Sequence, residues 1–75
     1  MNNQRRKAII EVTKKIELAA QNLRTLLEEE QEYYDNMPEN LQGSERGMDS
    51  ESAQDCIESA IESLEDAVLS LEEID

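Results

Sequence analysis

The stretch YYDNMPENLQGSERG, residues 33–47, is the one segment of this 75-residue chain that lacks a helical pattern. It holds the single proline, Pro38, and both glycines, Gly43 and Gly47. Because a proline disfavours the helical conformation of the residue before it, we expect the preceding helix to end near Asn36. A single break between two helical patterns predicts that the chain turns back on itself.

Apolar residues recur at steps of three and four on both sides of this stretch, as in amphipathic helices. The first pattern comprises Ile9, Val12, Ile16, Ala19, Leu23, Leu26, Tyr33 and Met37. The second comprises Ala53, Ile57, Ala60, Leu64, Ala67, Leu71 and Ile74. Beside the first pattern, Leu27 and Tyr34 widen the apolar strip, and Glu30 stands where an apolar residue is due. Beside the second lie the small residues Cys56, Ser63 and Ser70.

These patterns predict an all-α fold with a single domain over residues 1–75. We expect a helix at 3–36, a connector at 37–49 and a helix at 50–74, with Asp49 or Ser50 capping the second helix. A short connector between two long helices favours a two-helix antiparallel hairpin. Charge favours the same arrangement, because it brings a basic segment alongside an acidic one. The basic residues are Arg5, Arg6, Lys7, Lys14 and Lys15, and the acidic residues are Glu65, Glu72, Glu73 and Asp75.

Both helices carry apolar residues beyond the strip that a hairpin would bury. These are Ile10 and Leu18 on the first helix and Ile61 and Val68 on the second. They predict an oligomer interface, most simply a homodimer that forms a four-helix bundle. The alternative is that they form a docking site for a different protein.

The formal charge of -12 is spread unevenly along the chain. Residues 25–75 hold all of the 19 acids except Glu11 and Glu17, and their only basic residue is Arg46. Such a surface repels nucleic acid and anionic membranes, so neither is expected to bind directly. A protein with a basic surface is the expected partner.

Catalysis is not expected, because the chain has no histidine and no glycine-rich phosphate loop. The single cysteine, Cys56, has no histidine partner and is expected to be a packed or partly buried thiol rather than a nucleophile. No cofactor and no metal site are expected. A lone cysteine, and apolar runs no longer than three residues, lead us to expect a cytoplasmic protein without signal peptide or membrane span.

An acidic stripe follows the second helix at steps of three and four residues, where neighbouring side chains lie about 5–6 Å apart. It consists of Glu51, Asp55, Glu58, Glu62, Glu65 and Glu72, interrupted by Leu69. The stripe resembles a row of phosphates and is a candidate partner-binding surface, and therefore a candidate DNA mimic. The alternative is a solvated face that keeps the protein soluble.

The tip loop offers a second candidate surface, formed by Tyr33, Tyr34, Met37, Leu41 and Arg46. These are residue types that protein interfaces favour. The alternative is that the loop only closes the hairpin. In that case Pro38 would start a short helical turn, Met37 and Leu41 would fold back, and the glycines would supply backbone freedom.

The segment EEEQEYYDNMPENLQGSERG, followed by AIESLEDAVLSLEEI, resembles small acidic helical-hairpin proteins of Firmicutes and their phages and mobile elements. The resemblance covers residues 28–74 and implies a bacterial or phage setting, without site residues to transfer. The sequence therefore predicts a non-catalytic protein-binding module that engages, and in this setting inhibits, a host protein such as a nucleic-acid-binding or defence protein. The alternative is a structural or assembly protein whose apolar faces drive oligomerisation.

Overall fold

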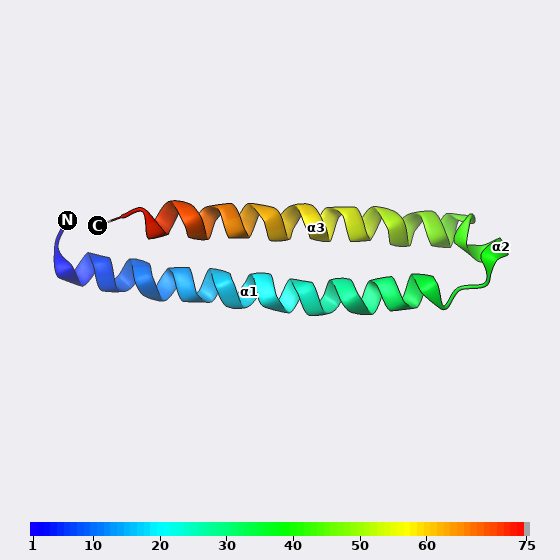
Figure 1. Ribbon diagram of the computed structural model, residues 1–75, viewed down its shortest axis with the longest axis horizontal. Helices are drawn as coiled ribbons and strands as arrows, with labels where there is room; N and C mark the ends of the chain where they lie inside the picture. The colour runs from blue at the N-terminus through cyan, green and yellow to red at the C-terminus, as the bar shows by residue number, and fades with distance from the viewer. Residues whose placement is uncertain (75) are drawn as a thin grey trace.

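The computed structural model describes residues 1–74 and shows an all-helical hairpin (Figure 1). Its helices are α1 (Asn3–Asp35), α2 (Glu39–Gln42) and α3 (Glu45–Glu72). The long helices α1 and α3 run antiparallel and side by side, and the short α2 closes the tip. The molecule is a rod of 59 × 14 × 13 Å. The predicted antiparallel hairpin is therefore confirmed.

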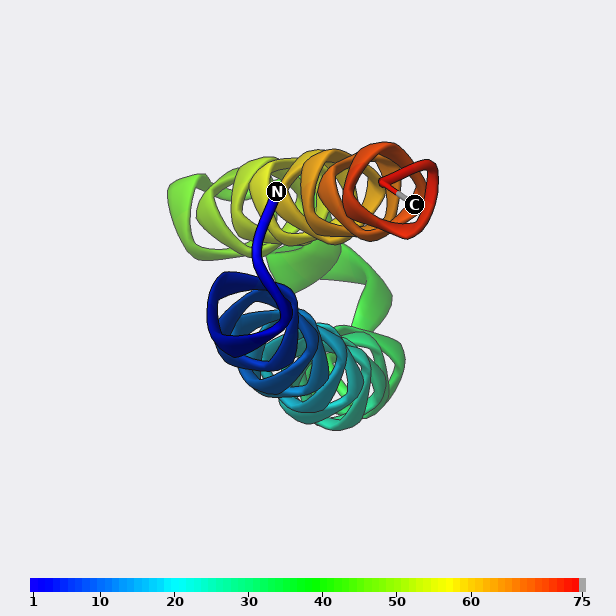
Figure 2. The same cartoon turned by 90° about the vertical axis from the view of Figure 1, so that its left-hand side faces the viewer.

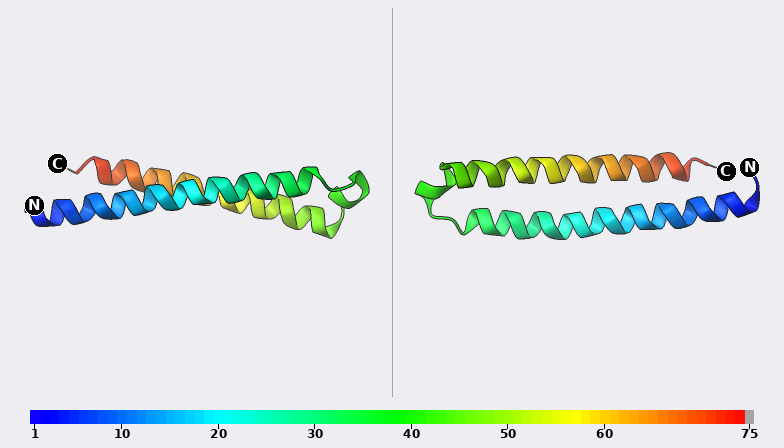
Figure 3. Two further views of the ribbon diagram at one scale, coloured as in Figure 1. Left: turned by 90° about the horizontal axis from the view of Figure 1, so that it is seen from below. Right: turned by 180° about the vertical axis from the view of Figure 1, so that it is seen from behind.

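The two long helices cross at a shallow angle, as the views along the rod (Figure 2) and from below (Figure 3) show. They touch along one strip of each helix, which we call the seam. The α1 side of the seam consists of Ile9, Thr13, Ile16, Ala20, Leu23, Leu27, Glu30, Tyr34 and Met37, all buried or half-buried. The α3 side consists of Gly47, Ser50, Gln54, Ile57, Ile61, Leu64, Val68 and Leu71, likewise buried or half-buried.

On α1, one of the two predicted apolar rows lies in the seam and the other is displaced from it by one residue, whereas on α3 the seam is broader than predicted. On α1 the buried row is Thr13, Ala20, Leu27 and Tyr34, whereas Val12, Ala19, Leu26 and Tyr33 are exposed. On α3, Gln54, Ile61 and Val68 lie in the seam beside Ala53 and Ala67, which are also half-buried, and of the predicted alanines only Ala60 is exposed.

The choice of residues that occupy the seam has a physical reason on each helix. Thr13 can be buried because its hydroxyl donates a hydrogen bond to the Ile9 carbonyl at 2.8 Å. On α3, Ile61 and Val68 fill the seam with more apolar volume than the alanines beside them. The prediction that Ile61 and Val68 lie on a spare oligomer face is therefore wrong, since Ile61 is only 7% exposed and Val68 is half-buried.

A polar layer interrupts the seam near the tip. The Ser50 hydroxyl donates a hydrogen bond to the Glu30 carboxylate at 2.6 Å, and the Gln54 amide donates one to the Ser50 hydroxyl at 3.4 Å. Glu30 thus occupies a seam position with its carboxylate satisfied. Because a polar group in a seam tolerates few alternative pairings, this layer fixes the register of α1 against α3.

The predicted ion pairs are not what joins the helices. Within residues 1–74 the only salt bridge joins Arg24 to Glu65, at 2.8 Å, and both side chains are about half exposed. The basic residues 5–15 make no salt bridge to the described acids of α3, and Asp75 lies outside the described residues. An exposed pair contributes only about 0–1 kcal/mol, so the seam carries the association.

The helix boundaries agree with prediction at α1 and differ at α3. Helix α1 ends at Asp35, with Asn36 at its C-cap. Helix α3 begins at Glu45 rather than at residue 50, so Asp49 and Ser50 lie inside it and do not cap it. Ser44 occupies the N-cap position, but its hydroxyl donates a hydrogen bond to the Leu41 carbonyl and caps no α3 amide.

The tip is held by a close backbone approach at Gly47. A Cβ atom at this residue would lie 1.9 Å from the Gln42 carbonyl oxygen. Neither Gly43 nor Gly47 has a positive φ, so the predicted use of glycine for backbone freedom is wrong. The Gln42 side-chain amide donates hydrogen bonds to the carbonyls of Tyr34 and Met37, at 3.1 and 3.3 Å. Gln42 of α2 thus joins the end of α1 to the start of α3.

We predict that Gly47→Ala destabilises the hairpin by roughly 1–3 kcal/mol, because the added methyl group must push Gln42 away. Gly43→Ala is the matched control, since a Cβ atom there meets nothing within 4 Å. Urea denaturation followed by circular dichroism measures both variants. Equal stability of the two variants would contradict the close approach.

Candidate protein-binding surfaces

The hairpin has two long sides of different chemistry, one on each side of the seam. We call the first the charged side. Its central contact is the Arg24–Glu65 salt bridge, which crosses the seam at 2.8 Å. A shallow hollow beside this bridge is lined by residues of both helices, namely Glu17, Ala20, Gln21, Arg24, Glu65, Val68, Leu69 and Glu72.

The acidic stripe lies along α3 on this charged side, and all six of its carboxylates are exposed. Two of them are engaged within the hairpin: Glu65 by Arg24, and Glu51 by the Tyr34 hydroxyl, which donates a hydrogen bond at 2.5 Å. The others make no salt bridge within the described part of the chain; they are Asp55, Glu58, Glu62 and Glu72. From Glu51 to Glu72 the stripe spans about 32 Å of helix.

The hydrogen bond to Glu51 changes the chemistry of Tyr34. It raises the pKa of Tyr34 above the ordinary value of 10.0, and burial and the negative charges of Glu51 and Asp35 raise it further. A raised pKa means that folding favours the neutral phenol. The contribution of Tyr34 to stability is therefore complete below pH 10 and is lost as the pH rises through the raised pKa.

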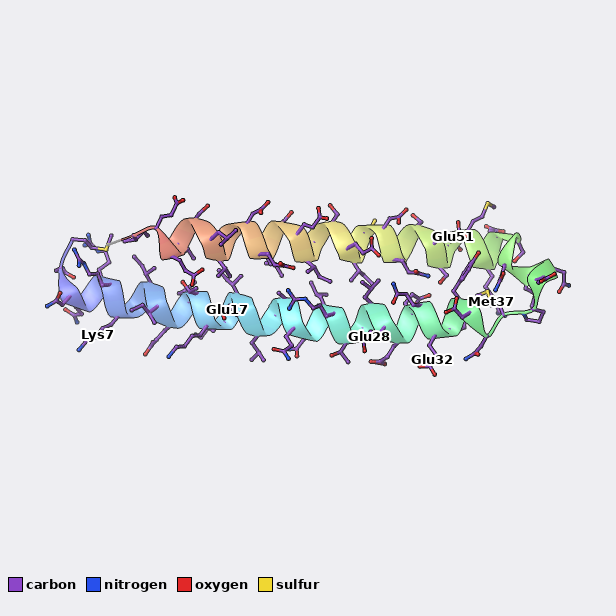
Figure 4. All side chains as sticks on the ribbon, in the orientation of Figure 1. Lys7, Glu17, Glu28, Glu32, Met37 and Glu51 are labelled. Carbon is purple, nitrogen blue, oxygen red and sulfur yellow. The ribbon has the colours of Figure 1, made fainter. Side chains whose placement is uncertain are left out.

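The predicted tip surface is divided between structural and accessible residues. Met37 is buried between the long helices (Figure 4), and Tyr34 is half-buried in the seam. Tyr33, Leu41 and Arg46 are exposed. Of these, Tyr33 and Arg46 line a shallow hollow together with Glu30, Glu45, Asp49 and Ser50. The loop therefore closes the hairpin through some of its residues and presents the others to solvent.

The opposite side of the seam, which we call the uncharged side, was missed by sequence reasoning. It consists of the exposed row Val12, Ala19, Leu26 and Tyr33 on α1 and of Ala53, Ala60 and Ala67 on α3, where Ala60 is exposed and the other two alanines are half-buried. Both rows lie on one side of the seam, because Tyr33 and Arg46, which is seven residues before Ala53, line the same hollow. The heptad spacing of these rows was visible in the sequence but was assigned to the seam.

The other predicted oligomer residues, Ile10 and Leu18, are both exposed on α1. Ile10 is exposed and lies at the open end of the rod, in a hollow with Ile9, Leu71 and Ile74. Leu18 is exposed at a position that is far from both seam rows of α1.

Cys56 is exposed and free, so the expectation of a packed thiol is wrong. No cluster of three or more metal-ligating side chains is found among residues 1–74. Over the same residues, none of the helices has the apolar length that a bilayer span needs.

No family model matches the chain, and no curated protein or solved structure is significantly similar to it.

We predict that Glu51→Gln lowers the pKa of Tyr34 toward its ordinary value, because the hydrogen bond to a carboxylate and the negative charge are both removed. A Tyr33→Phe background leaves Tyr34 as the single titrating phenol. Tyrosinate absorbance as a function of pH measures the midpoint. Glu62→Gln, a change in the same stripe, is the control and should leave the midpoint where it is. Identical midpoints for the two variants would show that Tyr34 does not bind Glu51.

Proposed function

We propose that this protein is a non-catalytic binding module that recognises a protein with a basic surface through the acidic stripe. The observation that carries the proposal is the set of exposed stripe carboxylates without a salt bridge, Asp55, Glu58, Glu62 and Glu72. Uncompensated charges on one face attract an oppositely charged surface and orient it as it approaches.

The density of charge argues for a basic protein surface in general over close mimicry of DNA. The stripe carries one carboxylate per about 5–6 Å of helix. B-DNA carries one phosphate per about 1.7 Å of axis, and a single strand one per about 3.4 Å. A partner whose binding site requires the full charge density of a DNA duplex would therefore bind the stripe weakly. In the bacterial or phage setting implied by the resemblance, a host nucleic-acid-binding or defence protein with a few exposed cations fits better.

A second candidate function, assembly, is favoured by the thin interior of the hairpin. The buried hydrophobic residues are Ala20, Met37 and Ile61, and no side chain of residues 1–74 is fully buried. Chains of this size usually need further burial, often from another copy. This role requires an apolar surface rather than the acidic stripe.

We predict that replacing Asp55, Glu58 and Glu62 with Lys abolishes capture of a basic partner, because it reverses the centre of the stripe. Capture is measured by affinity purification from bacterial lysate at low and high salt. The charged ligand of the captured protein is then tested for its ability to displace the hairpin. Charge-driven capture weakens as salt rises.

The matched control replaces Glu28, Glu32 and Asp35 with Lys, which changes the net charge equally. These three residues are exposed on α1, and Glu32 projects away from α3 (Figure 4). Loss of capture in the α3 variant alone supports the proposal. Equal loss in both variants would mean that net charge alone is recognised, and unchanged capture in both would exclude the stripe.

A further inference from the structure

We infer that the uncharged side is a self-association surface, through which two copies of the hairpin pack face to face with their tips at opposite ends. The inference rests on the second candidate function, assembly, and names the face and the orientation that would serve it. It does not involve the acidic stripe.

The exposed area of the hairpin exceeds that of a compact monomer by enough for an interface with a partner. It exposes 5809 Å², whereas a folded monomer of 8.6 kDa exposes about 4,700 Å². The excess of about 1,100 Å² exceeds the roughly 800 Å² that each partner buries in a standard interface. The excess follows from the rod shape, and a second rod laid alongside would remove it.

The uncharged side is the best candidate face because its middle joins apolar side chains with an absence of charge, and the charged residues Glu45, Arg46 and Asp49 border it only at the tip. On α1, Val12, Leu26 and Tyr33 are 49%, 52% and 48% exposed. On α3, a strip of small uncharged residues follows steps of three and four, on the side away from the acidic stripe. The strip consists of Ala53, Cys56, Ala60, Ser63, Ala67 and Ser70. Small side chains let a neighbouring helix approach closely.

The rows fit a second copy that runs in the opposite direction. With α1 antiparallel to the partner's α1, Val12 lies opposite Tyr33 of the partner subunit and Ala19 opposite Leu26 of the partner subunit. With α3 antiparallel to the partner's α3, Ala60 lies at the two-fold axis. The Arg24–Glu65 and Ser50–Glu30 contacts place the centres of the two rows level to within about one helical turn. One two-fold axis therefore serves both rows.

Charges at the edge of this face favour the same orientation. The next row outward on α1 holds Lys15, Asn22 and Glu29, seven residues apart and all exposed. An antiparallel partner brings Lys15 opposite Glu29 of the partner subunit, and the two-fold axis repeats the pair. On a larger scale, the basic and acidic ends of α1 lie at opposite ends of the rod, as Lys7 and Glu32 show (Figure 4). Packing with the tips together would instead stack two acidic tips.

The face is tested by mass in solution, measured by light scattering on the whole chain. The native protein is expected at twice 8.6 kDa. Leu26→Glu and Ala60→Glu place a charge on the face and should give monomers. Leu18→Glu and Leu69→Glu add the same charge at exposed positions away from the face and should stay dimeric. Circular dichroism verifies that each variant remains helical.

Two results of this experiment would overturn the inference. One is a native protein that is monomeric at all concentrations. The other is dissociation by Leu18→Glu to the same degree as by Leu26→Glu, which would place the interface on the outer side of α1.

The orientation is tested by a charge swap. Lys15→Glu alone and Glu29→Lys alone each put like charges opposite one another twice, so each should weaken its own dimer by about tenfold. Mixing the two variants restores both pairs, so native mass spectrometry should show a heterodimer in preference to either homodimer. A statistical mixture of dimers would overturn the orientation in which the two tips lie at opposite ends.

Failure of this inference is distinguishable from failure of acidic-stripe binding. Leu26→Glu leaves all six stripe carboxylates in place. A monomeric Leu26→Glu variant that still captures the basic partner at low salt shows that the two surfaces act separately. Loss of capture in that variant would mean that the partner recognises only the dimer.

Discussion

The hairpin depends on one seam between two helices, closed at the tip by the contact of Gly47 with the Gln42 backbone. A two-helix chain buries a single strip of each helix, so it cannot form an interior with several layers. Every residue outside the seam lies on the surface. The placement of the seam therefore decides which residues are structural and which are available to a partner, and a displacement of one residue exchanges the two sets.

The sequence was sufficient to predict the hairpin and the end of α1, because proline acts locally and three-four spacing identifies amphipathic helices. It could not decide between Val12 and Thr13, because rows one residue apart have the same period. Only the facing helix decides, by matching Thr13 and Ala20 to the bulkier residues of α3. Likewise the sequence shows that Gly47 is a glycine, but only the fold shows that close approach rather than backbone freedom requires it.

The electrostatic argument for an antiparallel hairpin reached the right arrangement through the wrong contacts. The only salt bridge within residues 1–74 involves Arg24, which was not among the predicted partners. The connector length and the seam explain the orientation without the basic residues 5–15. The segregation of charge along α1 is therefore not used to hold the hairpin together, and it remains available for contacts between molecules.

The two proposed surfaces are compatible because they lie on opposite sides of the seam. When two hairpins pack through their uncharged sides, both acidic stripes remain on the outside of the four-helix assembly. The two-fold axis makes the stripes run in opposite directions on opposite faces. Such a dimer could engage two basic partners, or two sites on one oligomeric partner, and the second contact would then benefit from the effective concentration that the first creates. Assembly would in this way strengthen recognition without adding any contact to the stripe itself.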